Sequence, residues 1–176
     1  MKSRSKIIIL GLLLGLMPLA VARAQNLNKA ALNGKYYFRH ILLVTDATGA
    51  ISQASSLAGA MNFDGQGKFT FQGQQTVGAA AAASFGGNGT YQVQSNGFVS
   101  ITNPQKSDLV LNARLAMSAI VGSSTEASGT VNDLFIAVLA PKGAVSNGLF
   151  LGIYQVATLE IPSGNASQAR NTLFNW

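Results

Sequence analysis

The sequence predicts an all-β protein, an antiparallel up-and-down meander of about eight to ten strands that closes, or nearly closes, into a barrel. Two observations predict this class. After position 24, β-branched and aromatic residues come in short runs separated by Gly, Asn, Asp and Ser, a pattern typical of strands and turns. No long amphipathic stretch with helical periodicity separates these runs, so consecutive strands are joined directly. A β-sandwich is the alternative, because the sequence does not determine whether the first and last strands pair.

The segment 1–24 has the pattern of a secretory signal peptide. A positively charged start over 1–6 precedes an apolar run over 7–16, and Ala22-Arg23-Ala24 supplies small residues at a cleavage site. A membrane anchor is the alternative, but a spanning helix needs roughly 20 apolar residues, and Pro18 interrupts this run. We therefore expect cleavage before Gln25 and export to the periplasm or the extracellular space.

Cleavage changes the charge of the protein. The full chain has 12 Lys and Arg against 6 Asp and Glu, a formal net charge of +6, and such an excess prompts a search for a nucleic-acid partner. Four of the cations lie in the segment 1–24, so the single β-domain expected over 25–176 keeps eight cations against six acids. The eight are scattered singly along the chain, so no nucleic-acid partner is expected.

The chain has no cysteine. This excludes disulfides, a lipid-anchoring cysteine, thiolate catalysis and cysteine-ligated metals. A domain of about 150 residues buries roughly 70% of the surface that its unfolded chain exposes. The hydrophobic core can therefore stabilise the exported domain without cross-links.

The first strands carry the clearest signals. An aromatic and apolar run over 36–44 predicts a strand that ends at the turn residues 46–49. The segment 57–73 predicts a hairpin around Asp64-Gly65-Gln66-Gly67, because glycine permits the positive φ that a tight turn needs. A second hairpin is expected over 89–102, with Asn-Gly in its turn and Pro104 after its last strand.

The later strands are expected over 108–117, 119–123, 132–139 and 149–161. In the first of them the odd positions are apolar, while Asn112 and Arg114 lie opposite, as in a sheet with one buried face. The segment 77–85 contains five consecutive alanines but is too short for a stable helix. We expect a loop or a weak strand there.

Three local patterns follow one another along the domain. They are L-x-G-x-Y-x-F over 32–38, F-D-G-x-G over 63–67 and G-x-Y-x-V over 89–93. In this order they resemble a group of uncharacterised secreted β-rich proteins from environmental bacteria. The resemblance spans most of the mature chain and implies a β-rich exported fold, often found in longer proteins with a second similar half. It implies no catalytic residues.

The sequence offers little for catalysis. It has no G-x-S-x-G elbow, H-E-x-x-H motif, phosphate-binding P-loop, G-x-G-x-x-G motif or EF-hand loop. His40 is the single histidine, so a multi-histidine metal site is impossible. We interpret His40 as a strand residue with a satisfied hydrogen bond, and the alternative is a general base or a pH-sensitive ligand contact. The six acids lie mostly in turns and at strand starts, so we expect neither an enzyme nor a cofactor or metal.

A ligand site, where one exists, is expected at the mouth or in the interior of the barrel. The candidate side chains are large, polar-tipped and set within apolar strands. They are Tyr36, Arg39, His40, Arg114 and Tyr154. The expected function is an exported, non-enzymatic barrel that binds a small apolar or amphipathic molecule.

Two other functions stay open. One is a cell-surface structural or adhesion module with unknown protein partners, which a solidly packed interior would favour. The other is a small outer-membrane barrel, indicated by the aromatic segment 172–176. Several runs are shorter than such a barrel requires, because a membrane-spanning strand needs about 9 to about 11 residues. Membrane contact is expected in that case alone.

Overall fold

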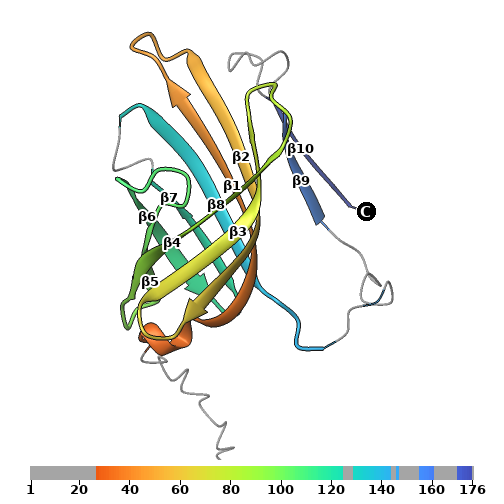
Figure 1. Ribbon diagram of the computed structural model, residues 1–176. Coiled ribbons are helices and arrows are strands. Elements are labelled where there is room, and N and C mark those ends of the chain that lie inside the picture. Colours follow the sequence, from red (N-terminus) through yellow and green to blue (C-terminus); the bar gives the residue numbers. More distant parts are fainter. Residues whose placement is uncertain (1–26, 125–128, 144–145, 147–154, 161–169, 176) are drawn as a thin grey trace, which may run out of the picture.

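The computed structural model describes residues 27–124, 129–143, 146, 155–160 and 170–175 (Figure 1). Eight strands form a closed barrel in which each strand pairs with the next and β1 pairs with β8, all antiparallel. They are β1 (Asn33–Thr45), β2 (Ile51–Asp64), β3 (Lys68–Val77), β4 (Ala83–Val93), β5 (Phe98–Thr102), β6 (Val110–Ala116), β7 (Ala119–Ser123) and β8 (Val131–Leu139). The predicted meander and its closure are confirmed, and a sandwich is excluded.

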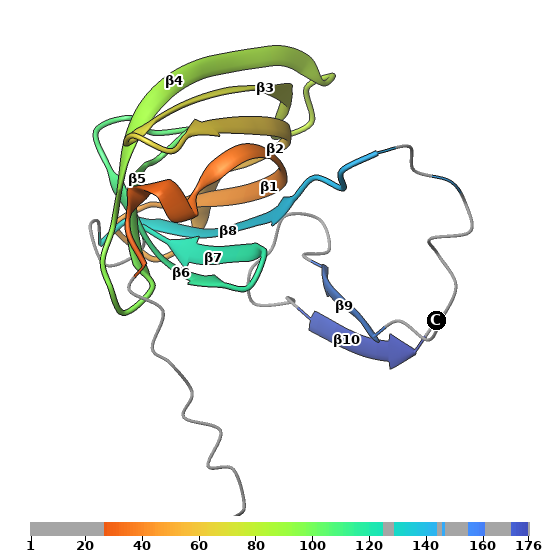
Figure 2. The ribbon, with the colours of Figure 1, turned by 90° about the horizontal axis from the view of Figure 1, so that it is seen from below.

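Three further elements accompany the barrel. A single 3-10 turn, η1 (Lys29–Ala31), precedes β1, and β9 (Gln155–Glu160) pairs with β10 (Arg170–Asn175) as a separate two-stranded sheet. In Figure 2 this sheet lies on the side of β7 and β8, away from β3 and β4. Over the described ranges, no helix is both long and apolar enough to cross a membrane.

The two predicted hairpins form for the expected local reasons. In the turn between β2 and β3, Asp64 Oδ1 accepts hydrogen bonds from the backbone N–H groups of Gln66, Gly67 and Lys68. These bonds, the one from Lys68 foremost, hold the pKa of Asp64 below its usual value. The turn between β4 and β5 places Gly97 at a φ of +81°, a conformation that glycine adopts without strain.

Two other turns refine the expected strand ends. β6 ends at Ala116, one residue before the predicted end, and Met117 is a fully exposed turn residue with a φ of +53°. The reason is geometric, because a tight hairpin connection requires positive φ and interrupts the alternation. Of the segment 77–85, for which a loop or a weak strand was expected, residues 78–82 connect β3 to β4, which begins at Ala83.

The barrel interior near η1 is filled by aromatic side chains. The Phe63 ring lies 5.3 Å from the Tyr36 ring and 5.1 Å from the Tyr91 ring, between centroids. The Tyr91 hydroxyl donates hydrogen bonds to the carbonyl oxygens of Lys29 (3.0 Å) and Leu32 (2.8 Å). We call this end of the barrel, closed by η1, Leu32 and Tyr91, the apolar end.

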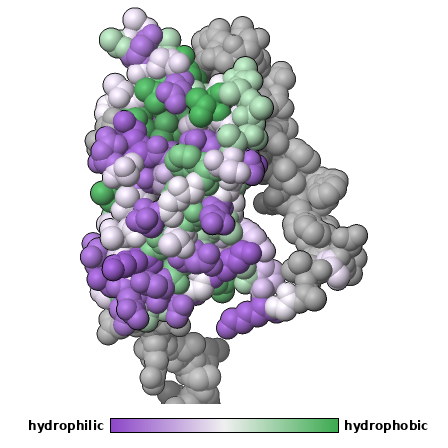
Figure 3. Space-filling model, viewed as in Figure 1, coloured by the Kyte–Doolittle hydropathy of each residue, from purple (hydrophilic) through white to green (hydrophobic). Residues whose placement is uncertain are grey.

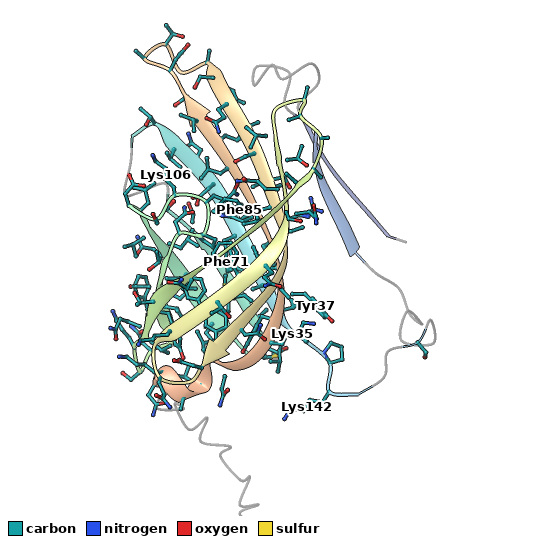
Figure 4. All side chains as sticks on the ribbon, in the orientation of Figure 1. Lys35, Tyr37, Phe71, Phe85, Lys106 and Lys142 are labelled. Atoms are coloured by element: carbon teal, nitrogen blue, oxygen red, sulfur yellow. The ribbon has the colours of Figure 1, made fainter. Side chains whose placement is uncertain are left out.

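The aromatic packing continues toward the middle of the barrel. Phe71 lies 6.2 Å from Phe38 and 5.9 Å from Phe85, between ring centroids, and Figure 4 shows the Phe71 and Phe85 side chains along this part of the barrel. The fully buried aliphatic residues include Leu32, Leu57, Met61, Val99, Ile101, Leu111 and Ile120. The interior is a solid core over these residues.

Candidate functional site

The opposite end of the barrel holds a buried polar cluster centred on Asp133 of β8. Asp133 Oδ2 lies 2.8 Å from Nε2 of His40 on β1, and both side chains are fully buried. The Ser124 hydroxyl donates to Oδ2 (2.8 Å), while the Ser124 backbone N–H (2.5 Å) and the Ser123 hydroxyl (3.0 Å) donate to Oδ1. Burial alone would raise the pKa of Asp133, but the hydrogen bonds from His40 and Ser124 outweigh it and lower that pKa. The cluster therefore favours an ionised carboxylate.

The connection between β5 and β6 joins this cluster through Asn103. Its side-chain Nδ2 donates to Ser124 Oγ (2.9 Å) and to Asp133 Oδ2 (3.2 Å). Its Oδ1 accepts from the backbone N–H groups of Gln105 (2.9 Å) and Lys106 (3.0 Å). Figure 4 places Lys106 at the end of the barrel away from η1, so Asn103 fixes the connection across that opening.

Gln105 extends the same connection to the other side of the barrel. Its Oε1 accepts hydrogen bonds from Ser55 Oγ of β2 (2.8 Å) and Gln75 Nε2 of β3 (3.0 Å). Its Nε2 donates to the backbone oxygen of His40 (3.0 Å). Asn103 and Gln105 thus join β7 and β8 to β1, β2 and β3, and we call this hydrogen-bonded closure the polar end.

The geometry of the polar end does not activate a nucleophile. A His–Asp pair assists nucleophilic catalysis when the second imidazole nitrogen faces a hydroxyl or thiol. Here both serine hydroxyls donate to the carboxylate, and His40 Nδ1 is buried without a hydrogen-bond partner. Within the described part of the chain, no group of three or more metal-binding side chains gathers either. The cluster is arranged to hold strands together.

Two of the predicted ligand-binding residues face the barrel interior. Tyr36 and His40 lie at inward-facing positions of β1 and are buried. Tyr36 packs against Phe63, and burial raises the pKa of its hydroxyl. The interpretation of His40 as a strand residue with a satisfied hydrogen bond fits its bond to Asp133, with Nδ1 left over.

The two predicted arginines lie on the outside instead. Arg39 Nη1 donates to Ser56 Oγ (3.2 Å), and Arg114 Nη1 donates to the Asn96 carbonyl oxygen (3.3 Å). Both occupy the solvent-facing parity of their strands, because successive side chains point to opposite faces of a sheet. The prediction that Arg39 and Arg114 line the barrel interior is therefore wrong. The fifth candidate, Tyr154, lies outside the described residues.

The other members of the polar end were not predicted from the sequence. Asp133, Asn103 and Gln105 were not candidates. Asp133 lies near the start of a predicted strand, and Asn103 and Gln105 lie in a predicted loop, where polar residues are common without any function. One signal was present for Asp133: it lies at the same parity as Val131 and Phe135, both buried. A charged residue at an inward position of a strand indicates a buried partner.

A second feature of the structure is the open edge of β4. β4 pairs with β3 up to Thr90 but with β5 only over Tyr91–Val93. The Tyr91 N–H donates toward β3, to the Gly67 oxygen (2.9 Å), whereas the Thr90 N–H donates to the other side, to Thr102 Oγ1 (3.1 Å). Successive backbone N–H groups of a strand point alternately toward its two neighbouring strands. The N–H groups of Ser84, Gly86 and Asn88 therefore point away from β3.

The edge over 83–89 is paired, among the described residues, with β3 alone. Three grooves of about 610, 690 and 660 Å³ lie over β2, β3 and β4, on the paired side of this edge, and each includes residues of β4 between Ser84 and Thr90. Gly89 lets the Phe69 ring pack against the β4 backbone, because a Cβ at Gly89 would lie 2.6 Å from that ring. Figure 3 shows hydrophilic and hydrophobic residues interspersed over the face of the molecule that carries β3 and β4.

A third feature is an apolar outer surface, which we call the β8 face. It consists of Leu134, Ile136 and Val138 on β8, Val121 on β7 and Tyr37 on β1, each between 43% and 48% exposed. The register places Val121 opposite Ile136, and Tyr37 opposite Val138, so the residues are neighbours. Figure 4 shows Tyr37 beside Lys35, whose ammonium lies 4.9 Å from the ring centroid.

Comparison with known proteins gives no match. No protein-family model, no curated protein and no solved structure is significantly similar to the chain. The function is therefore inferred from the geometry of the molecule itself.

Proposed function

We propose that the protein is an exported, non-enzymatic interaction module, of the surface structural or adhesion type, that accepts an extended strand of a partner at the open edge of β4. The observation that carries this proposal is the edge over 83–89, which among the described residues pairs with β3 alone. Exposed N–H and C=O groups of an edge strand are a template for another strand. Strand addition is a recurrent mode of peptide recognition.

The composition of the edge supports this function. The segment over 83–90 contains no charged residue and no proline, and these are the usual means by which proteins block an edge against pairing. An uncharged, accessible edge is the arrangement that such a module needs.

The packed interior supports an outer binding surface over an inner one. Tyr36, Phe38, Phe63, Phe71 and Tyr91 are each at most 5% exposed. Ligand-binding barrels instead keep a concave apolar space for their ligand. A partner bound from outside requires no rearrangement of this core.

Binding of a small apolar or amphipathic molecule is the second candidate function. It is favoured by the groove of about 610 Å³, whose lining includes Phe63 and Phe69. Native mass spectrometry of the purified domain tests it, with a co-purifying small molecule as the expected result. A domain that carries no such molecule and leaves an apolar fluorescent probe unbound would exclude this candidate.

The export part of the proposal rests on the expected signal peptide. The outer face of β3 carries Lys68, Thr70, Gln72, Gln74 and Thr76, whereas a membrane-spanning barrel needs an apolar outer band. This supports a barrel that faces water on that side. We expect the native chain in the periplasmic or culture fraction of expressing cells, and its recovery with outer membranes would contradict this.

Substitution at Asn88 tests the strand-addition proposal. Asn88→Pro removes an N–H from the open edge and leaves the bonds to β3 in place, since a proline is tolerated where its nitrogen faces solvent. Asn88→Ala is the matched control, because it removes the side chain and keeps the N–H.

The readout is the binding of extended peptides selected against the wild-type domain by display. We expect wild type and Asn88→Ala to bind them alike and Asn88→Pro to bind them about tenfold more weakly, as the loss of roughly one hydrogen bond implies. Equal binding by Asn88→Pro, or selection of no peptide, would contradict strand addition at β4.

A further inference from the structure

We propose that the β8 face, together with the cations that border it, docks on the surface of a bilayer that contains anionic lipids. Single exposed apolar residues are ordinary on protein surfaces, but a contiguous group of large ones marks an interaction site. The five residues of the β8 face keep between 43% and 48% exposure with β9 and β10 present in the structure. The described part of the chain therefore leaves this face uncovered.

Two arginines flank the β8 face on one lateral row of the barrel wall. The row crosses four adjacent strands in the order Arg39, Ile136, Val121 and Arg114. Lys35 borders the same face, with its ammonium over the Tyr37 ring. All three cations are exposed. The apolar residues thus lie between cations on the outside of the barrel.

No acid balances these cations among the described residues. The ion pairs there are the buried one of Asp133 and the exposed one between Lys106 and Asp108, so neither involves a cation of this wall. The exposed acids of the barrel, Asp46, Asp64 and Asp108, lie in turns and at a strand end. The face has an apolar centre and a cationic border, which is the charge pattern that suits an anionic surface.

Both arginines retain donors for an anion. The Nη1 bonds of Arg39 to Ser56 and of Arg114 to Asn96 occupy one N–H group each, and a guanidinium has five. Guanidinium groups bind phosphate with two parallel hydrogen bonds. Long cationic side chains also lay their stems along apolar surface while their charged ends reach outward. The arginines can therefore contact lipid phosphates while the apolar residues between them meet the acyl boundary.

The shape of the wall favours a bilayer over a peptide. Over 135–138, β8 is paired with β1 on one side and with β7 on the other, so it offers no free edge there. The three grooves lie over β2, β3 and β4 instead. Peptide recognition uses edges and grooves, whereas the convex outer wall of a barrel fits a fluid surface.

Charge argues against a second copy as the occupant. A two-fold contact places the same patch of both subunits face to face. The border of this patch carries Lys35, Arg39 and Arg114, and the described wall offers no carboxylate to meet them. Self-association through the β8 face would therefore bring like charges together.

Docking through the β8 face leaves the open edge of β4 in solution. Figure 2 shows β3 and β4 on the side of the barrel away from β7. The contact is peripheral and distinct from a membrane-spanning barrel, because the outer face of β3 is polar. Attraction by a few surface cations is reversible and weakens with salt. A salt wash therefore releases the chain into the soluble fraction.

Vesicle sedimentation of the full mature chain tests the role of the cations. We expect binding at low ionic strength to phosphatidylcholine vesicles that contain about one third phosphatidylglycerol, and none to pure phosphatidylcholine. Arg39→Gln with Arg114→Gln should weaken binding roughly 30-fold, because each cation near an anionic surface contributes about fivefold. Lys68→Gln with Lys106→Gln removes the same charge elsewhere on the barrel and should change binding less than about twofold.

A single cysteine locates the contact, because the chain has none of its own. Ile136→Cys carries an environment-sensitive fluorophore on the β8 face, and Thr70→Cys carries it on the polar outer face of β3 as the matched control. We expect the anionic vesicles to shift the emission to the blue at position 136 alone. Near-ultraviolet circular dichroism checks that each variant is folded.

Four results would overturn the proposal. Equal weakening by the lysine pair would assign binding to net charge, and equal shifts at positions 136 and 70 would assign it to non-specific adsorption. A shift at position 136 that grows with protein concentration without lipid would assign the face to a second copy. No response to either vesicle would leave the face to an acidic protein partner. None of these results bears on peptide binding at β4, so the two proposals fail separately.

Discussion

The two ends of the barrel are closed by different physical means. At the apolar end, aromatic rings and Leu32 fill the opening, and the Tyr91 hydroxyl anchors η1. At the polar end, one carboxylate, one imidazole and two amide side chains bridge the strands. Apolar packing is non-directional and spread over many contacts, whereas the polar closure depends on a few atoms and on one ionised group. The second closure is therefore the more vulnerable.

The largest expected effect is the loss of Asp133. Asp133→Ala leaves His40, Asn103 and Ser124 without their shared acceptor in a buried place. Leaving these buried polar groups without their carboxylate acceptor costs about 3 kcal/mol or more. We expect the free energy of unfolding to fall by this amount in denaturant titrations.

A matched control lies in the same region. Asp108 pairs with Lys106 at 3.7 Å, but its side chain is 69% exposed, so Asp108→Ala should change the free energy of unfolding by less than about 1 kcal/mol. Similar losses in both variants would show that the polar end does not depend on the buried carboxylate.

A core truncation measures the apolar closure on the same scale. Met61 is fully buried and lies opposite Tyr36 and Phe71 in the register. Met61→Ala should lower the free energy of unfolding by about 3 kcal/mol through lost burial and a residual cavity. Thr70→Ala, at an exposed position of β3, should change it by less than about 0.5 kcal/mol. A small loss for Met61→Ala would mean that this end is loosely packed.

Acid should weaken the polar end through protonation of Asp133. The folded-state pKa of Asp133 lies below its usual value, so its ionised form contributes stability above the unfolded pKa, about 4, that is lost as the pH falls through the folded pKa. We expect the free energy of unfolding to decline more steeply below about pH 4 in wild type than in Asp133→Asn. Asp46 and Asp64, whose pKa values are also lowered, are common to both proteins and cancel in the comparison. Parallel pH profiles would contradict the role of Asp133.

The sequence predicted the features that local chemistry determines. The hairpin turns at Asp64-Gly65-Gln66-Gly67 and at Asn96-Gly97 follow from residues adjacent in the chain, and so does the alternation that buries Leu111 and Ala113. The sequence favoured a closed barrel but could not establish it, because closure depends on the pairing of β1 with β8, the first and last strands of the barrel. The structure supplied that pairing.

The polar end lay beyond sequence reasoning for the same reason. His40 and Asp133 are far apart in the chain, and their meeting depends on the register between β1 and β8. A shift of one residue would move either side chain to the outer face. Arg39 and Arg114 were candidates by residue type, although the alternation over 108–117 already placed Arg114 opposite the apolar face, and both are exposed in the structure.

The smallest expected effect tests the hydrogen bonds of the Tyr91 hydroxyl at the apolar end. Tyr91→Phe removes the hydroxyl that donates to Lys29 and Leu32 but keeps the ring against Phe63. The loss should be about 1 kcal/mol, the net contribution of a typical hydrogen bond, and Tyr37→Phe at the exposed β8 face should cost less than about 0.5 kcal/mol. The acid profile of Tyr91→Phe should keep the wild-type shape, because the variant leaves Asp133 and its partners in place. A loss of several kcal/mol, or a changed acid profile, would show that the two ends are energetically coupled and that the barrel does not close at each end independently.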